Sequence, residues 1–261
     1  MSLSLGSTSI GSMYVGGRKI AEAWLGSSKV FGQSAPSEVT IGGRTYSTVT
    51  IGNQVWMAEN LDWKFSGLTF RDGVDGNEIT NNVNLAQAAY YDYDESTYGV
   101  NGNKYGLLYN WASVDYINSH LSELGVPSGW HVPTHDEWSA LKSTVGEPSG
   151  TKLKSTTGWE TSSGTDDFGF SMVPAGDWVM NGTSGVFTLL TQQAMYWTPE
   201  TESASQTYYA WTCHVGDVQS SLQIGTHDKR MCVSVRLVKS LSSTEDESPD
   251  GDDDDDPGEF G

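Results

Sequence analysis

Residues 129–138 read GWHVPTHDEW and hold a dense group of side chains that could do chemistry. The candidates for metal binding or acid–base catalysis are His131, His135, Asp136 and Glu137. Thr134, however, stands three residues before Glu137, and this spacing is typical of a capping box at the start of a helix. Acids in a first helical turn also favour the positive end of the helix dipole. The pattern therefore predicts a helix start.

The residues on either side of Thr134 support this interpretation. Pro133 precedes the cap, so His131 and His135 do not share a helical face and cannot form an i, i+4 metal pair. Apolar residues then recur at helical spacing as far as Gly146, where we expect the helix to end. These residues are Trp138, Leu141 and Val145. A metal or acid–base site remains the alternative to this structural interpretation.

The two cysteines are the next candidates for chemistry. Strand alternation places Cys213 on an apolar face and Cys232 on a polar face, so a disulfide between them would need a bulge. We expect two free thiols. A nucleophile elbow, a Walker loop and an HExxH motif are all absent from the sequence. No other catalytic motif is found, and we expect a protein that is not an enzyme.

Two acidic loops are candidates for calcium. The first, residues 71–78, has Val74 where an EF-hand needs an oxygen ligand, so the match fails. The second loop supplies Asp92, Asp94 and Glu95. Short acidic loops of this kind are typical of Asx turns, which we expect in both. Calcium at Asp92, Asp94 and Glu95 is the alternative, and we expect no other cofactor.

Charge and composition limit the classes of partner. The chain has 261 residues, 14 Lys and Arg against 33 Asp and Glu, and a formal charge of −19, which argues against nucleic acid or an anionic membrane. No apolar run is long enough to span a bilayer, and no secretory signal is recognisable, so we expect synthesis in the cytoplasm. The 30 Gly, 10 Trp and 12 Tyr favour a loop-rich fold held by aromatic side chains.

The chain divides into four predicted segments. They are a β-repeat arm (1–32), a hinge (33–38), a main domain (39–240) and a disordered acidic tail (241–261). The arm repeats every ten residues, with short β segments too small to bury an apolar face alone. We expect it to attach the protein to a larger assembly or to form an oligomer, with a trimer as the expected state. The alternative is a β-arm folded onto the main domain.

The main domain has an α+β pattern. Residues 39–56 predict a hairpin followed by a strand, and residues 105–124 have apolar positions at helical spacing. With the helix after Thr134, this gives two helices. After Lys142 the pattern predicts only strands and loops.

Eight ordered segments carry a family resemblance. They are TVTIGNQVWMAENL (48–61), YYDYDESTYG (90–99), YGLLYNWASV (105–114), PSGWHVPTHDEW (127–138), KLKSTTGW (152–159), DDFGFSMVPAGDW (166–178), YWTPE (196–200) and SVRLVK (234–239). Together they resemble the Fibrobacter succinogenes major paralogous domain, over roughly residues 39–240. The resemblance implies a C-type-lectin-like domain, related to formylglycine-generating enzymes, with two helices and C-terminal hairpins that display a ligand surface.

Two departures and one further likeness refine this expectation. Relatives often carry cysteines where this chain has Val126 and Leu237, and the replacement fits assembly in a reducing compartment. The arm resembles N-terminal segments of phage tail and virion proteins. Similar domains in phages and bacteria are targets of diversity-generating retroelements, which vary surface residues near the C-terminus.

Alternation in residues 207–236 agrees with a display surface. The more apolar set is Tyr209, Trp211, Cys213 and Val215, and the other set is Tyr208, Ala210, Thr212 and His214. On the returning strand the apolar set contains Met231, Val233, Val235 and Leu237, whereas Arg230, Cys232 and Ser234 form the other set. Tyrosine among short polar residues is a paratope-like mixture. The alternative is an ordinary solvated sheet face.

These expectations combine into one function. The predicted ligand-binding residues are Tyr208, Trp211, Thr212, His214, Asp217, Gln219, Ser221, Gln223, Thr226, His227, Lys229 and Arg230. We expect a virion protein whose residues 1–32 attach to a tail component and whose face binds a protein or glycan receptor on a bacterial surface. A formylglycine-generating-type oxidase and a purely structural virion component are the alternatives.

Overall fold

The computed structural model describes two units of the chain. One unit comprises Met1–Gln33 with Leu241–Gly261, and the other comprises Ser34–Ser240. The described residues are 13–15, 18–20, 23–25, 28–31, 38–74, 76–98, 105–203 and 206–241. The predictions of a hinge and of a disordered tail concern segments that lie almost wholly outside them.

The first unit contains two short hairpins. β1 (Met13–Val15) pairs with β2 (Arg18–Ile20), and β3 (Ala23–Leu25) pairs with β4 (Ser28–Phe31). Both pairs are antiparallel. The strands start five residues apart, so each hairpin takes up about one ten-residue repeat.

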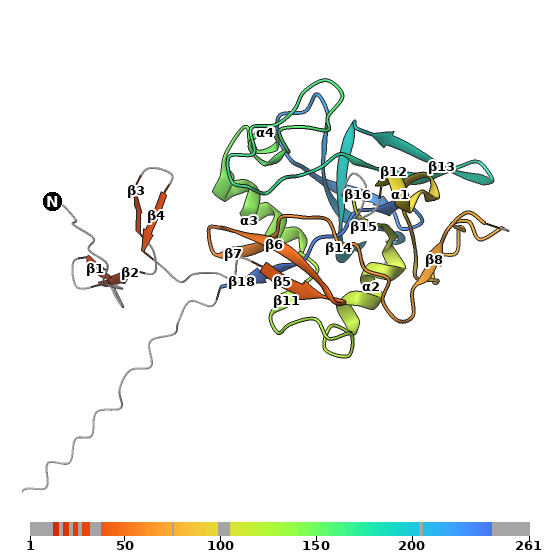
Figure 1. Cartoon of the computed structure of the whole chain (residues 1–261), viewed down its shortest axis with the longest axis horizontal. Coiled ribbons are helices and arrows are strands. Elements are labelled where there is room, and N and C mark those ends of the chain that lie inside the picture. Colours follow the sequence, from red (N-terminus) through yellow and green to blue (C-terminus); the bar gives the residue numbers. More distant parts are fainter. Residues whose placement is uncertain are drawn as a thin grey trace, which may run out of the picture. The chain divides into compact units, whose positions relative to one another are not determined.

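The main unit is α+β and rich in antiparallel sheet (Figure 1). A five-stranded sheet has the order β11 (Trp130–His131), β18 (Val238–Ser240), β7 (Gln54–Met57), β6 (Arg44–Ile51), β5 (Glu38–Ile41). A six-stranded sheet has the order β13 (Ser184–Leu190), β12 (Ala175–Asn181), β17 (Cys232–Val233), β10 (Leu108–Asn110), β9 (Gln87–Ala89), β8 (Thr69–Arg71). Only β8 and β9 are parallel among the strand pairs described in these sheets. The hairpin and strand predicted for residues 39–56 are confirmed as β5, β6 and β7.

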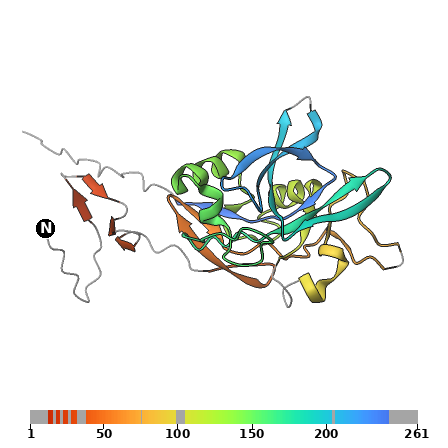
Figure 2. The ribbon, with the colours of Figure 1, turned by 90° about the horizontal axis from the view of Figure 1, so that it is seen from above.

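A three-stranded sheet contains most of the predicted ligand face. Its order is β14 (Gln193–Ser203), β15 (Gln206–Gly216), β16 (Gln223–Asp228). Seen from above, the β14–β15 hairpin projects from the rest of the main unit (Figure 2).

Two longer helices accompany the sheets, as predicted. They are α2 (Trp111–Ser119) and α3 (His135–Val145). α2 is shorter than the predicted span because residues 108–110 form a strand and the Asn110 side chain caps the helix. The 3-10 turn η1 (Tyr91–Tyr93) and the one-turn helices α1 (Glu95–Tyr98) and α4 (Ser149–Leu153) had no periodic signal. The prediction of strands and loops alone after Lys142 was therefore wrong at α4.

The start of α3 confirms the capping box. The Thr134 hydroxyl accepts the Glu137 amide hydrogen at 3.2 Å, and the Glu137 carboxylate accepts the Thr134 amide hydrogen at 2.9 Å. The apolar stripe of α3, including Trp138, then packs into an aromatic core. The centre of the Trp138 ring lies 4.6 Å from the ring centre of Trp56 and 5.3 Å from the ring centre of Tyr196.

Arg236 lies at the centre of this core, with 1% of its surface exposed. Its guanidinium donates hydrogen bonds to Asn60 Oδ1 and to the carbonyl oxygens of Met57, Phe170 and Ser171. It also lies 4.5 Å from the centre of the Phe170 ring. One planar side chain therefore joins β7, the loop before β12 and the C-terminal strands.

Among the described residues, no helix has the length and hydrophobicity needed to cross a membrane.

We expect Arg236→Met to lower the free energy of unfolding by at least about 3 kcal/mol, because four buried acceptors lose their donor. Urea denaturation followed by tryptophan fluorescence measures this loss. The matched control is Arg230→Met, which removes a surface pair with Asp228 and costs less than about 1 kcal/mol. Equal losses in the two variants would contradict the central role of Arg236.

Candidate functional site

One face of the three-stranded sheet packs onto α3, as alternation predicts. Cys213 and Val215 of β15 are fully buried and share a core cluster with Trp138 and Leu141 of α3. Tyr196 of β14 belongs to the same cluster. This face is a rigid support for whatever the rest of the sheet displays.

The predicted exposure of Thr212 was wrong. Thr212 has no exposed surface, because Trp197 of the neighbouring strand β14 lies beside it and is itself buried. The Trp197 indole donates to the Tyr109 carbonyl oxygen at 2.9 Å, which fixes that ring over the sheet. The second face of β15 is therefore half covered by the six-stranded sheet.

The predicted exposure of Asp217 was also wrong. Its carboxylate accepts amide hydrogens from Thr161 at 2.9 Å and Ser162 at 2.8 Å. The buried Lys154 ammonium donates to the carbonyl oxygens of Asp217 and Ser162. Because the loop after α4 folds over Asp217, this side chain closes a loop instead of facing solvent.

Burial also removes Lys229, Cys232 and Ser234 from the predicted polar face. The Lys229 ammonium lies 3.8 Å from the centre of the Trp111 ring on α2. Cys232 on β17 and Ser234 just after it are buried, and so is Val233 between them, so both faces of this short segment are covered. Alternation cannot reveal that both faces of such a strand are covered.

The exposed residues of the predicted set lie at two ends of the sheet. Tyr208 is 65% exposed, and Gln219 and Gln223 are exposed at the opposite end of β15. The half-buried members are Trp211, His214, Ser221, Thr226, His227 and Arg230. Gln219 accepts the Gly216 amide hydrogen at 2.8 Å and so stabilises its own turn, whereas Ser221 donates to Glu147 between α3 and α4.

Tyr209 is a residue that alternation misplaced. It belongs to the apolar set, yet it is 42% exposed, because β15 extends beyond the helix that covers the core. The boundary is Trp211, whose ring lies 4.9 Å from that of His135 at the start of α3. Position relative to this boundary therefore decides, together with alternation, which side chains of β15 reach solvent.

The open end of the β15–β16 hairpin carries Tyr208, Tyr209, Trp211, Asp228 and Arg230. We call these five residues the "hairpin-base surface". Tyr209 pairs with Asp228 across β15 and β16, and the Tyr208 carbonyl oxygen accepts the Lys229 amide hydrogen at 2.9 Å. Arg230 forms an ion pair with Asp228, and this pairing raises the pKa of Arg230. The surface thus combines aromatic rings from both faces of the end of β15 with an ion pair, on a hydrogen-bonded strand pair.

Both cysteines are free, as predicted, and both are fully buried. Burial raises the pKa of each thiol well above its usual range. Thiols in this state are poor nucleophiles and poor metal ligands, since the thiolate is the reactive form.

The calcium candidates are engaged with protein groups. Asp94 accepts from the Ser96 hydroxyl at 2.6 Å and from the Thr97 amide at 3.1 Å, and Glu95 accepts from Lys64 at 2.9 Å. Asp92 is in the left-handed backbone conformation at φ 48°. In the first acidic loop, Asp72 accepts the Val74 amide hydrogen, which is an Asx turn. Nowhere in the described part of the chain do three His, Cys, Asp or Glu side chains group around a possible metal position.

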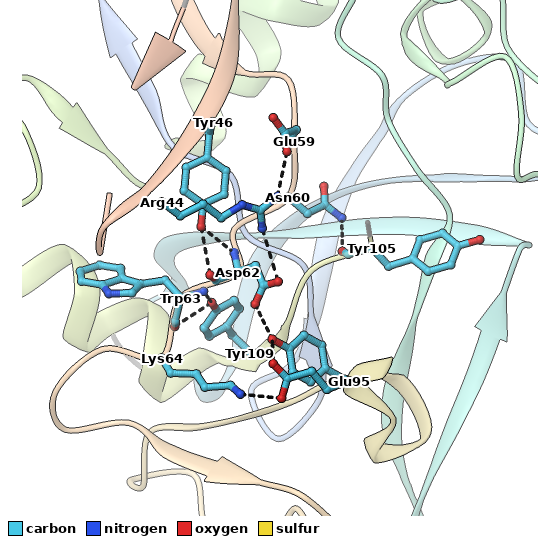
Figure 3. A network of polar contacts seen from close by, with 11 residues as sticks. Arg44, Tyr46, Glu59, Asn60, Asp62, Trp63, Lys64, Glu95, Tyr105 and Tyr109 are labelled. Carbon is cyan, nitrogen blue, oxygen red and sulfur yellow. Dashed lines mark hydrogen bonds and ion pairs between the residues drawn. The ribbon is translucent and has the colours of Figure 1, made fainter. Parts of the chain in front are cut away.

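Figure 3 shows a charged network that sequence patterns did not reveal. Arg44 bonds Glu59 at 2.9 Å and lies 3.4 Å from Asp62, and Tyr90 donates to Asp62 at 2.7 Å. Burial raises the pKa of Asp62, although Tyr90 and Arg44 oppose this effect. Glu95 also accepts from Tyr90, and its partner Lys64 completes the network. Since its two cations and three carboxylates all have partners within the protein, we interpret it as structural.

A depression of about 430 Å³ lies beside this network, between β6 and the loop before β12. Its charged lining residues are Glu59 and Arg236. Both are bound by protein partners, Glu59 by Arg44 and Arg236 by carbonyl oxygens. The exposed lining of the depression is more apolar than polar, with hydroxyl and amide groups among it.

The fold and the site together define an α+β domain that supports a projecting hairpin on an aromatic core. Comparison with known families matches residues 49–239 to the Fibrobacter succinogenes major domain. The chain belongs to this family, and the resemblance seen in the eight segments is confirmed. Neither the comparison with curated proteins nor that with solved structures found a match.

His131 provides a pH-dependent prediction. Its Nε2 lies 2.8 Å from Glu137, and this hydrogen bond, partly opposed by burial, raises the pKa of His131. Burial opposes ionisation of Glu137, but the bonds from His131 and Thr134 outweigh it and lower the Glu137 pKa. The His131 contribution to stability is therefore complete below its unfolded pKa of about 6.5 and disappears as pH rises through the raised folded value. The Glu137 contribution disappears as pH falls through its lowered value.

We expect wild-type protein to lose more stability between pH 6 and pH 8, as approximate limits, than His131→Gln does. Urea midpoints measured across this range test the difference. Burial lowers the pKa values of His214 and His227, and these residues contribute the opposite slope equally to both proteins. Identical pH profiles would show that the His131–Glu137 bond is not formed in solution.

Asp217→Asn tests the corrected role of Asp217. We expect it to lower the free energy of unfolding by about 1–3 kcal/mol, because an amide cannot accept both backbone hydrogens as a carboxylate does. Gln223→Ala, at an exposed position, is the control and should leave the denaturation midpoint unchanged. If Asp217→Asn leaves the free energy of unfolding unchanged, Asp217 does not close the loop and belongs to the solvent-facing set.

Proposed function

We propose that this protein is a non-enzymatic receptor-binding protein with a C-type-lectin-like main domain, and that the hairpin-base surface is the centre of its binding site. The exposure of Tyr208 and Tyr209 carries the proposal. Two large exposed aromatic side chains on successive positions of a hydrogen-bonded strand, together with Trp211 and an ion pair, have the composition of an interface hot spot. Their strand is anchored in the core by Cys213 and Val215, so binding orders little further.

The partner that fits this surface is a protein or glycan receptor on a bacterial cell. Tyrosine and tryptophan offer both an apolar face and a polar edge, which suits either chemistry. The net charge of −19 disfavours nucleic acid and anionic lipid. Residues 1–32 attach the protein to a virion tail component in this proposal, as part of a homotrimer.

Retroelement diversification of the surface is part of the proposal. Tyr208 and Tyr209 on β15 and Arg230 in the turn after β16 lie outside the core cluster, so their side chains can change with little repacking. A reverse transcriptase gene and a near-copy of the DNA for residues 196–236 beside this gene would support it. Sequencing of the locus provides that test.

The oxidase alternative receives less support. Formylglycine-type chemistry needs reactive thiols, whereas Cys213 and Cys232 are fully buried and their pKa values are raised. A purely structural role remains the competing hypothesis, and it predicts no cellular ligand.

We expect labelled full-length protein to bind at least one strain in a panel of intact bacteria, as measured by flow cytometry. The triple variant Tyr208→Ala, Tyr209→Ala and Arg230→Ala should bind at least about tenfold more weakly, because hot-spot residues are removed together. Its denaturation midpoint should change little, since all three side chains lie at the surface.

The matched control is Val186→Ala with Leu189→Ala, which removes two exposed apolar side chains from β13 in another sheet. This variant should label cells as wild type does. Undiminished labelling by the triple variant would refute the assigned surface. Failure of the wild type to label any strain would favour the structural role.

A further inference from the structure

Two histidine rings converge on the half-exposed part of the three-stranded sheet. The ring centres of His214 on β15 and His227 on β16 lie 5.3 Å apart, and the ring planes are nearly perpendicular at 88°. Both side chains are half-buried. No other pair of histidine rings in contact is found among the described residues.

The strand register explains why the rings meet. Gly225 pairs with Thr212, between the positions of the two histidines, and it carries no side chain. A Cβ built on Gly225 would lie 3.8 Å from the His214 ring. The two imidazoles therefore lean toward each other across the space that glycine leaves open.

Thr212 fixes the orientation of His227. Its hydroxyl lies 3.3 Å from the Gly225 carbonyl oxygen and 2.8 Å from His227 Nδ1. A carbonyl oxygen can only accept, so the single hydroxyl proton goes to Gly225 and the hydroxyl accepts a proton from His227 Nδ1. This leaves the Nε2 lone pair of His227 available. A second group that orients a histidine in this way is typical of metal ligands.

His214 has a nitrogen that the protein does not use. Its Nδ1 is buried and has no hydrogen-bond partner within the described part of the chain. Burial, together with the nearby His227, lowers the pKa of His214 to about 4, and burial lowers that of His227. Both imidazoles are therefore neutral near pH 7, which is the form that binds metals.

We propose that His214 and His227 together bind a divalent transition-metal ion of the zinc class. Two imidazoles on one tetrahedral zinc ion, with Zn–N bonds of about 2.0–2.1 Å, place their ring centres about 5 Å apart, close to the observed separation. The described residues supply no third His, Cys, Asp or Glu to this site. Water or a donor atom of a bound molecule completes the coordination, which makes the site open.

The metal site does not depend on the proposed receptor function, because metal binding is measured without a receptor. If both hold, an open metal position beside the hairpin-base surface provides a direct bond to a carboxylate, imidazole or hydroxyl of the ligand.

Isothermal titration calorimetry of the full chain with zinc chloride tests the proposal. Excess magnesium is included to occupy the acidic tail and other carboxylates, since imidazole sites prefer zinc. We expect one zinc ion per chain with a Kd on the order of 10 µM, as two protein ligands bind more weakly than four. His214→Gln and His227→Gln should each weaken binding at least about tenfold.

Two further variants make the test specific. His120→Gln changes a histidine that bonds the Tyr116 carbonyl oxygen on α2, and it should bind zinc as wild type does. Thr212→Val removes the group that orients His227 and should weaken zinc binding about tenfold. Circular dichroism confirms that each variant is folded.

Nuclear magnetic resonance of the imidazole Cε1–H groups gives a second readout that needs no variant. Zinc should shift only the resonances of His214 and His227 among the five histidines. The proposal is overturned if wild-type protein binds no zinc in magnesium buffer, or if the double variant His214→Gln, His227→Gln binds it equally well. If the triple variant of Tyr208, Tyr209 and Arg230 loses cell labelling and wild-type protein binds no zinc, the receptor function is supported and the metal site is refuted.

Discussion

The structure depends on a buried cation that has no carboxylate partner among the residues that the structure describes. The Arg236 guanidinium is compensated by three carbonyl oxygens, one amide oxygen and the faces of Phe170 and Tyr196. Burial of a charge is costly unless every donor is satisfied, so the surrounding segments must hold their positions together. The hydrogen bond from Arg236 also orients the Asn60 side chain. Asn60 Oδ1 accepts a second hydrogen bond from the Tyr196 hydroxyl, which connects β14 to the core.

In this arrangement, the residues that stabilise the fold are different from the residues that are exposed on the hairpin. Tyr196 and Cys213 hold the inner face of the β14–β15 hairpin, whereas Tyr208 and Tyr209 extend beyond the edge of α3. Replacing the outer side chains leaves the inner contacts intact. A domain organised in this way tolerates variation at its binding surface because the free energy of folding comes from residues elsewhere.

Sequence patterns over a few residues correctly predicted the features that depend on interactions between residues close in sequence. The capping box of Thr134 and Glu137 involves residues three positions apart, and the inward direction of Cys213 and Val215 follows from the pleat of one strand. Arg236 had no such signal, because its acceptors lie up to 179 residues away. The sequence pattern does not show that the segment before β18 is enclosed by distant residues.

The errors at Asp217, Lys229 and Thr212 have the same physical origin. Each side chain is covered by a segment distant in sequence: the loop at Thr161 and Ser162, Trp111 of α2, and Trp197 of β14. The convergence of His214 and His227 also depends on pairing register, which places Gly225 between them. Such contacts follow from topology, and a single sequence does not reveal them.

The five-stranded sheet contains both ends of the main unit, with Glu38 on β5 and Ser240 on β18. Three strand spacings and the offset in register separate these two residues by about 20 Å. A module whose entry and exit points share one sheet can be joined to different carrier proteins without threading a chain through its interior. This geometry favours exchange of the whole main unit between genes as a portable cassette, in addition to change within its surface.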